Sequence, residues 1–367
     1  MEIGIAQLLP SFGCDSSVTD NQVYHEEVEL AALADTMDYD HIWAVEHHFE
    51  DYSFCPDNFV YLSHLAARTK RIKLATGAVI VPWHLQPMRI AERAAMLDQL
   101  TNGRFMLGLG RGLARREFEQ FGIAMDESRE RYDEAAPLII EALESGFWPE
   151  HEGKYFKTPR VPLRPAPYSR EWRDNRFTQV AMSPDSAEQA ARLGAQVMAF
   201  NYKPIEQMSQ EYEEYKAHFR NYQGREPRPM LMTEMMVCDS DAARAREHAE
   251  RYVANYGISV LDHYEMLGEQ FSAAKCYPTY AEAAAAMREV GKENVIKGYV
   301  EQQIWGTPDQ ILRRFEERFA QMGDYGILCV FRFGGTPFEV AERSMRLFND
   351  ECIPVLRGWA KERAAAA

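Results

Sequence analysis

The chain has 367 residues, of which 46% are hydrophobic, so it can bury a large core. Its formal net charge of −15 disfavours nucleic acid and anionic membranes as partners, because both are negatively charged. There is no apolar run of the roughly 18 residues that a membrane span needs, and the N-terminus lacks the basic segment of a signal peptide. The six cysteines form no C-x-x-C pair, so we expect free thiols in a cytoplasmic protein.

Short β-rich runs alternate with longer amphipathic stretches, a pattern typical of βα units and a parallel sheet. Eight strands are expected, at residues 3–9, 41–47, 72–81, 105–109, 177–182, 196–201, 229–238 and 325–333. Helices are expected at about 22–37, 57–69, 87–100, 128–144, 184–193, 205–219, 241–256, 308–322 and 337–349. This count fits an α/β fold of the (β/α)8 or TIM-barrel type, with residues 1–367 forming one domain.

Two segments interrupt the alternation and are interpreted as insertions after strands four and seven. Residues 148–176 are rich in proline and basic residues, and residues 257–303 contain one helical stretch at 280–290. The second segment is a candidate lid over the barrel mouth. A doubly wound open sheet is the alternative architecture, but the turn at residues 10–13 lacks the glycine-rich fingerprint of a dinucleotide site.

The end of the second strand contains two adjacent histidines, His47 and His48. Strand ends form the mouth of a barrel, where catalysis takes place. Because neighbouring residues on a strand point to opposite faces, at most one of the two faces the mouth. That imidazole would suit proton transfer, whereas the alternative is a packing or capping pair. No metal site is expected, because the first two strands lack the H-x-H spacing of barrel hydrolases.

The ends of strands four and five contain candidate anion-binding groups. Arg111 lies between Gly110 and Gly112, where the backbone can approach a phosphate closely and the guanidinium can bind it with two hydrogen bonds. Ser183 precedes Pro184, so we expect it to be the N-cap of a helix whose first N–H groups and serine hydroxyls bind an anion. A solvated arginine and an ordinary helix cap are the alternatives. Core packing is the role expected of Met182, Met198, Phe200, Met232 and Met235.

Several ordered blocks resemble the bacterial-luciferase-like flavin-dependent monooxygenases over nearly the whole chain. The blocks are residues 42–49, 76–82, 84–87, 97–105, 110–113 and 306–308. The resemblance implies a barrel that binds reduced FMN, supplied by a flavin reductase, and forms a C4a-peroxyflavin with O2. It further implies oxygenation of a small organic substrate and assembly as a homodimer or as a heterodimer with a related chain.

The resemblance also assigns roles to individual residues. The catalytic candidates are His47, His48 and Glu117, with His47 as base or hydrogen-bond donor. The cofactor-binding candidates are Gly77, Ala78, Gly110, Arg111, Leu113, Ser183, Ser186 and Asn201. Arg111 and the two serines correspond to the phosphate site, and the Gly77–Ala78 bond corresponds to a non-prolyl cis peptide beneath the flavin ring.

Three departures from the large subunit of luciferase argue against light emission and a long-chain aldehyde substrate. Gly110 replaces a reactive cysteine, Met182 replaces an acid, and Asn201 replaces a tryptophan. Two other functions stay open for this fold: a deazaflavin-dependent dehydrogenase and a non-catalytic partner subunit. Retention of Arg111 and His47 argues against the partner subunit.

Overall fold

A computed structural model describes residues 1–269, 271 and 277–366. Among them, eight strands form one parallel barrel: β1 (Ile3–Gln7), β2 (His41–Ala44), β3 (Lys73–Thr76), β5 (Phe105–Gly110), β10 (Phe177–Val180), β11 (Gln196–Phe200), β12 (Leu231–Cys238) and β14 (Gly326–Val330). The strands follow the order β10-β11-β12-β14-β1-β2-β3-β5, and β5 pairs with β10 to close the barrel. The predicted barrel is confirmed, and the open sheet is excluded.

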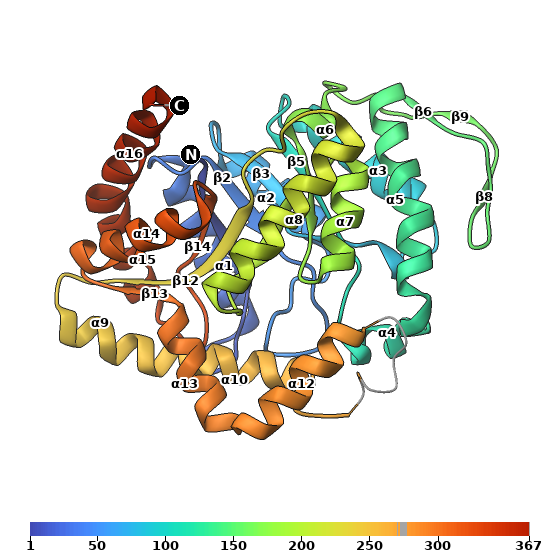
Figure 1. Cartoon of the computed structure of the whole chain (residues 1–367). Helices are drawn as coiled ribbons and strands as arrows, with labels where there is room; N and C mark the ends of the chain where they lie inside the picture. The colour runs from blue at the N-terminus through green and yellow to red at the C-terminus, as the bar shows by residue number, and fades with distance from the viewer. Residues whose placement is uncertain (270, 272–276, 367) are drawn as a thin grey trace.

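Helices surround the barrel (Figure 1). They are α1 (Asp20–Asp35), α2 (Asn58–Arg68), α3 (Met88–Leu100), α5 (Ser128–Ser145), α7 (Pro184–Leu193), α8 (Ile205–Gln223), α14 (Pro308–Met322), α15 (Phe338–Leu347) and α16 (Ile353–Ala366). Helix α14 illustrates their construction: Thr307 and Gln310 form a capping box at its start, and Ile311, Phe315 and Phe319 are buried at helical spacing. Helix α16 was not predicted. No helix in the described part of the chain is apolar over the length that a bilayer requires.

Several predicted strands end earlier than expected at the barrel mouth, and the second and third of them shape the site. The second ends at Ala44 rather than at residue 47, because the chain turns so that the backbone N–H of His47 donates to the carbonyl of Cys55. The third is broken into β3 and β4 (Val79–Ile80) by a cis peptide bond between Gly77 and Ala78. Residues that follow these strands therefore line the mouth.

The first predicted insertion contains two short antiparallel strand pairs outside the barrel. Strand β6 (Phe147–Trp148) pairs with β9 (Val161–Pro162), and β7 (His151–Glu152) pairs with β8 (Lys157–Thr158). The short helix α6 (Trp172–Asn175) then leads back into β10.

The second predicted insertion begins later than its expected boundary. Helix α9 (Ala242–His248) continues through a π-helical turn at Ala249–Val253 into α10 (Ala254–His263), so residue 257 lies within a helix. Helices α12 (Pro278–Val290) and α13 (Lys292–Gln302) follow, and the short strand β13 (Ile304–Gly306) pairs with β12. Helices α10, α12 and α13 lie together across one end of the barrel (Figure 1).

The cysteines in the described part of the chain are Cys14, Cys55, Cys238, Cys329 and Cys352, and all are free thiols as expected. Cys276 lies outside the described residues. Three of the residues expected in the core, Met198, Met232 and Met235, are buried.

Candidate active site

A cavity opens at the carboxyl ends of the barrel strands, where the sequence predicted a site. It has a volume of about 1140 Å³, space open to solvent included. Eight predicted site residues line it: His47, Gly77, Ala78, Gly110, Arg111, Leu113, Glu117 and Ser186. Met182 and Phe200 are half-buried and also line the cavity, although Met182 packs against the main core as expected. A cavity of this size with a few polar groups on an apolar wall is typical of cofactor and substrate sites.

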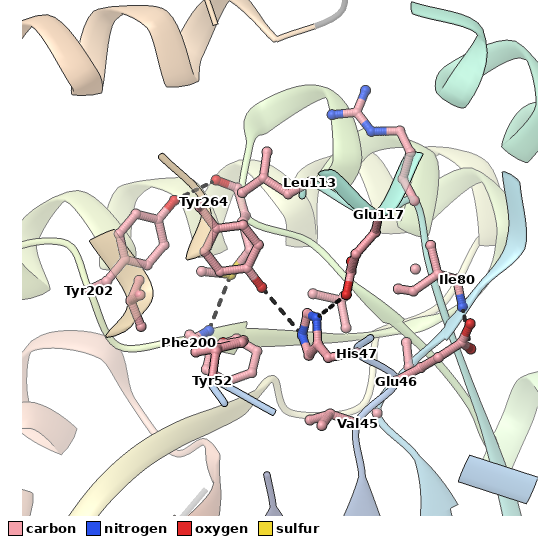
Figure 2. A pocket seen from close by; sticks show the side chains of 18 of the residues that line it. Val45, Glu46, His47, Tyr52, Ile80, Leu113, Glu117, Phe200, Tyr202 and Tyr264 are labelled. Atoms are coloured by element: carbon pink, nitrogen blue, oxygen red, sulfur yellow. Dashed lines mark hydrogen bonds and ion pairs between the residues drawn. The ribbon is translucent and has the colours of Figure 1, made fainter. Parts of the chain in front are cut away.

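His47 lies near the middle of the cavity wall, between a carboxylate and a phenol. Its Nδ1 is 3.1 Å from Oε1 of Glu117, and its Nε2 is 3.4 Å from the hydroxyl of Tyr264. Figure 2 shows Glu117 and Tyr264 on opposite sides of the ring. A carboxylate at Nδ1 fixes the orientation of the ring, so Nε2 can exchange a proton with a molecule in the cavity.

Glu117 comes from helix α4 (Arg115–Gln120), which was not predicted. The carboxylate is buried, and its Oε1 also accepts the backbone N–H of His48 at 2.8 Å. Burial alone would raise the pKa of Glu117, but the charge and hydrogen bond of His47, the charge of His263 and this backbone N–H lower it overall. An ionised Glu117 therefore faces His47 at neutral pH.

His48 does not line the cavity. Its ring packs edge-on against Phe121 at 4.8 Å and against Trp83 at 5.7 Å, and its Nε2 lies 3.6 Å from Oε1 of Glu46. This agrees with the expectation that only one of the two histidines faces the mouth. The assignment of His48 as a catalytic residue gains no support from this geometry, because the ring has no access to a ligand in the cavity.

Glu46 accepts hydrogen bonds from the segment that follows the break in the third strand. Its Oε2 accepts the backbone N–H of Ile80 at 3.0 Å, and its Oε1 accepts the indole N–H of Trp83 at 2.7 Å. Burial alone would raise the pKa of Glu46, but hydrogen bonds from His48 and His84, the charge of His84 and the Ile80 N–H lower it to about 2. The charged carboxylate is thus the form that the folded protein prefers.

We expect Glu46→Gln to lower the free energy of unfolding by about 3 kcal/mol at pH 7, the energy that corresponds to a pKa lowered from 4.5 to about 2. This contribution is complete above the ordinary pKa of a glutamate and is lost as the pH falls towards the folded-state value. Urea unfolding at pH 7 and pH 3 measures it, and the difference between variant and wild type should shrink at pH 3. The exposed Glu29→Gln is the control. An equal difference at both pH values would contradict the argument.

Two of the anion-binding candidates, Arg111 and Ser186, line the cavity. Arg111 lines the cavity, and its guanidinium lies over the ring of Tyr277 at 4.3 Å. Ser183 is the N-cap of α7 as predicted, but its side chain makes no capping hydrogen bond. Its hydroxyl lies 3.0 Å from that of Ser186 instead. An ordinary cap therefore does not explain Ser183, and paired hydroxyls at a helix start, with Ser186 in the same cavity wall as Arg111, suit a phosphate group.

Gly77 and Gly110 in the cavity wall are closely packed against their neighbours. A Cβ atom at Gly77 would lie 3.1 Å from the ring of Trp43, and one at Gly110 would lie 3.2 Å from the Cβ of Ala78. Both distances are shorter than ordinary packing, so a side chain at either position would displace its neighbours. The packing of the wall itself therefore requires both glycines, and this part of the cavity carries no side chain. The residues present fit a flavin, because the cavity combines Arg111 and Ser186, which suit a phosphate, with an apolar wall that suits a flat ring.

The comparisons with known proteins agree with this geometry. Residues 1–326 match the family model described as luciferase-like monooxygenase. The chain belongs to the luciferase-like monooxygenase family. The resemblance inferred from the ordered sequence blocks is thereby confirmed.

Individual relatives of this luciferase-like monooxygenase extend the comparison. The oxygenase component of the flavin-dependent trigonelline monooxygenase of Acinetobacter baylyi is 31% identical over 61% of this chain, and the match spans only 62% of that relative's length. The alkanal monooxygenase alpha chain of Photorhabdus luminescens is 25% identical over 92% of this chain and 93% of its own. The crystal structure of the monooxygenase RslO1 from Streptomyces bottropensis has a TM-score of 0.81 at 28% identity and covers 97% of this chain and 100% of its own.

In this luciferase-like monooxygenase, Asn201 does not line the cavity. Its amide Nδ2 donates to Glu234 at 2.8 Å and to the backbone carbonyl of Gln302 at 3.0 Å. The side chain thus links β11 to the end of α13 beneath the cavity. Its predicted contact with the cofactor gains no support, because both donor positions of the amide face protein.

Sequence reasoning missed a wall of six tyrosines in the cavity of this luciferase-like monooxygenase. They are Tyr52, Tyr202, Tyr256, Tyr264, Tyr280 and Tyr299. Three of them, Tyr264, Tyr280 and Tyr299, come from the segment predicted as the second insertion, where no regular spacing marks which side chains face the mouth. Their clustering within one predicted lid is the only sequence signal that could have indicated them.

The structure also brings His263 to the His47–Glu117 pair. One ligand atom from each of the three residues lies within 4.8 Å of the others, a set that is also compatible with a metal ion. The sequence argument against a metal considered only the first two strands and did not include His263, which comes from the end of α10.

Proposed function

We propose that this chain is the oxygenase component of a two-component flavin-dependent monooxygenase, using reduced FMN and O2 to oxygenate a small organic substrate. The observation that supports this best is the shared cavity. Arg111 and Ser186, which suit a phosphate, line the same cavity as the His47–Glu117 pair, which suits proton transfer. In this proposal a separate reductase supplies the flavin.

In this proposal each polar group of the site has one task. Arg111, Ser183 and Ser186 would hold the flavin phosphate, and the cavity wall at Gly77 and Gly110 would leave room for the ring. The bound reduced flavin supplies the electrons that activate O2. His47 holds or releases a proton at Nε2, and its pairing with Glu117 at Nδ1 keeps the ring in position for this. The tyrosine wall limits the access of water.

The relatives support the partner in the same proposal. The Acinetobacter relative is named as an oxygenase component, which implies a reductase in that system. We extend this arrangement to the present chain and propose that it works as a dimer in the cytoplasm. Free thiols at the five described cysteines are what a cytoplasmic enzyme would contain.

Anaerobic titration of the purified protein with reduced FMN tests the proposal. We expect a saturable change in flavin absorbance and fluorescence, followed on mixing with O2 by slower appearance of oxidised flavin than in a protein-free control. Reduced deazaflavin is titrated in parallel. A response to deazaflavin alone would replace the proposal with the dehydrogenase alternative, and a response to neither would leave the partner-subunit alternative.

A further inference from the structure

His263 lies behind His47, away from the opening of the cavity. Its ring is 2% exposed, stacks on Tyr52 at 4.4 Å with an interplanar angle of 16°, and lies edge-on to His47 at 5.1 Å. An aliphatic or aromatic side chain would satisfy this packing equally well. The polar atoms of the ring therefore call for their own explanation.

One of these atoms connects to the surface. Nδ1 of His263 lies 2.8 Å from Oε2 of Glu50, whose side chain is 25% exposed and also binds Arg116. Burial raises the pKa of Glu50, but the hydrogen bonds and charges of Arg116 and His263 lower it overall, so it is an ionised acceptor. Nδ1 of His263 therefore carries a proton and donates a hydrogen bond to Glu50.

The other atom points at the catalytic pair. With Nδ1 protonated, Nε2 of the neutral ring has a lone pair, and this buried atom has no hydrogen-bond partner among the described residues. Oε1 of Glu117 lies 3.9 Å away. This same oxygen is 3.1 Å from Nδ1 of His47. Oε1 of Glu117 thus lies between the two imidazoles. Nε2 of His263 is a buried acceptor that could take a proton from it.

We propose that His263 and Glu50 carry protons between His47 and solvent by way of Glu117. The reaction that delivers the proton rests on the proposed function, whereas the route rests on this geometry alone. When His47 gains a proton at Nε2, it passes its Nδ1 proton to Oε1 of Glu117. Glu117 then swings to close the 3.9 Å gap and passes a proton to Nε2 of His263, which releases its Nδ1 proton to Glu50. One proton enters, one leaves, and no electrons move.

The surroundings favour passage along this route over storage. Burial, together with the charge of His47, lowers the pKa of His263 to about 4, although Glu117 and Glu50 act in the opposite direction. A proton therefore stays only briefly on His263 at neutral pH. Burial also raises the pKa values of Tyr52 and Tyr264, so neither phenol ionises and competes. The charged groups around Glu50 are Arg116 and, beyond it, Glu265 and Arg115.

Proton exchange at His47 tests the route without any flavin or substrate. In the full-length flavin-free protein, labelled with ¹⁵N in its histidine rings, NMR measures the rate at which the Nδ1 proton of His47 exchanges with water. His263→Phe keeps the stacked ring and removes both nitrogens. We expect exchange to slow about tenfold in this variant, because Glu117 then has no acceptor behind it. His248→Phe, the same change outside the cavity, should leave the rate unchanged.

A second variant keeps His263 and removes only the exit. Glu50→Gln can still accept a hydrogen bond from Nδ1 but cannot take the proton, so it too should slow exchange about tenfold. His263→Asn is measured if the phenylalanine variant does not fold. Wild-type exchange rates in folded His263 and Glu50 variants would overturn the route, whatever the flavin titration shows. Failure of the flavin titration together with slow exchange in both variants would reject the proposed function alone.

Discussion

Arg111→Ala is expected to weaken the binding of reduced FMN more than tenfold, since a charge-assisted hydrogen bond to a phosphate is lost. Arg111 lies on the cavity wall, and its guanidinium is positioned over the ring of Tyr277 at 4.3 Å. The variant keeps the paired hydroxyls of Ser183 and Ser186, so the loss of affinity measures the contribution of Arg111 alone. Anaerobic titration followed by fluorescence gives the dissociation constant directly.

A charge at a distance provides the control for this prediction. Arg192→Ala removes an exposed arginine from the far end of α7, where it pairs with Glu188. Its affinity for reduced FMN should stay within a factor of about two of the wild type, because an exposed charge at this distance is screened by salt. If both variants bound equally well, Arg111 would not be part of the phosphate site.

His47→Ala should slow product formation by about 10²-fold or more while leaving the affinity for reduced FMN nearly intact, because the imidazole transfers a proton and does not touch the phosphate side. Single-turnover experiments that begin with bound reduced flavin separate the two effects. The rate of product formation by wild type and variant is then compared at pH 6, 7 and 8. A pH dependence that disappears in the variant would identify His47 as the titrating group.

The adjacent histidine tests whether position or residue type matters. His48→Gln changes a ring that packs against Phe121 and lies outside the cavity, so we expect it to affect thermal stability more than the rate of product formation. A loss of rate equal to that in His47→Ala, with unchanged stability, would restore the catalytic role that the sequence suggested for His48.

The barrel could be predicted because hydrophobic periodicity reports burial, and each strand is buried on both sides. Strand ends are less regular, since they depend on contacts from elsewhere in the chain. Ala44 ends β2 because the next residues turn towards residues 53–55, and nothing in the local sequence shows this turn. The break between Thr76 and Val79 was suggested only by a glycine and by the family resemblance.

The site divides in the same way. Arg111 and Ser186 were found because their sequence context, glycine-rich or beside a helix start, itself favours anion binding. Glu117 was found only through resemblance, since helix α4 has no marked pattern. His263 was missed because it is 146 residues beyond Glu117 in the chain, and only the complete fold brings the two within 3.9 Å. The cofactor-binding role of Asn201 was inferred from the family resemblance alone, and the amide instead forms hydrogen bonds with Glu234 and the carbonyl of Gln302.

The helices across the barrel mouth form one continuous stretch of chain. Tyr256 lies in α10, Tyr264 directly after it, Tyr280 in α12 and Tyr299 in α13, and all four line the cavity. His47, Arg111 and Ser186 come from earlier parts of the chain. Changes confined to the cavity-facing tyrosines of this segment can therefore alter the substrate, whereas Tyr277 of the same segment contacts Arg111 and His263 lies near Glu117. Two relatives that share every flavin-binding residue need not share a substrate, so motif similarity assigns the type of reaction and not the molecule on which it acts.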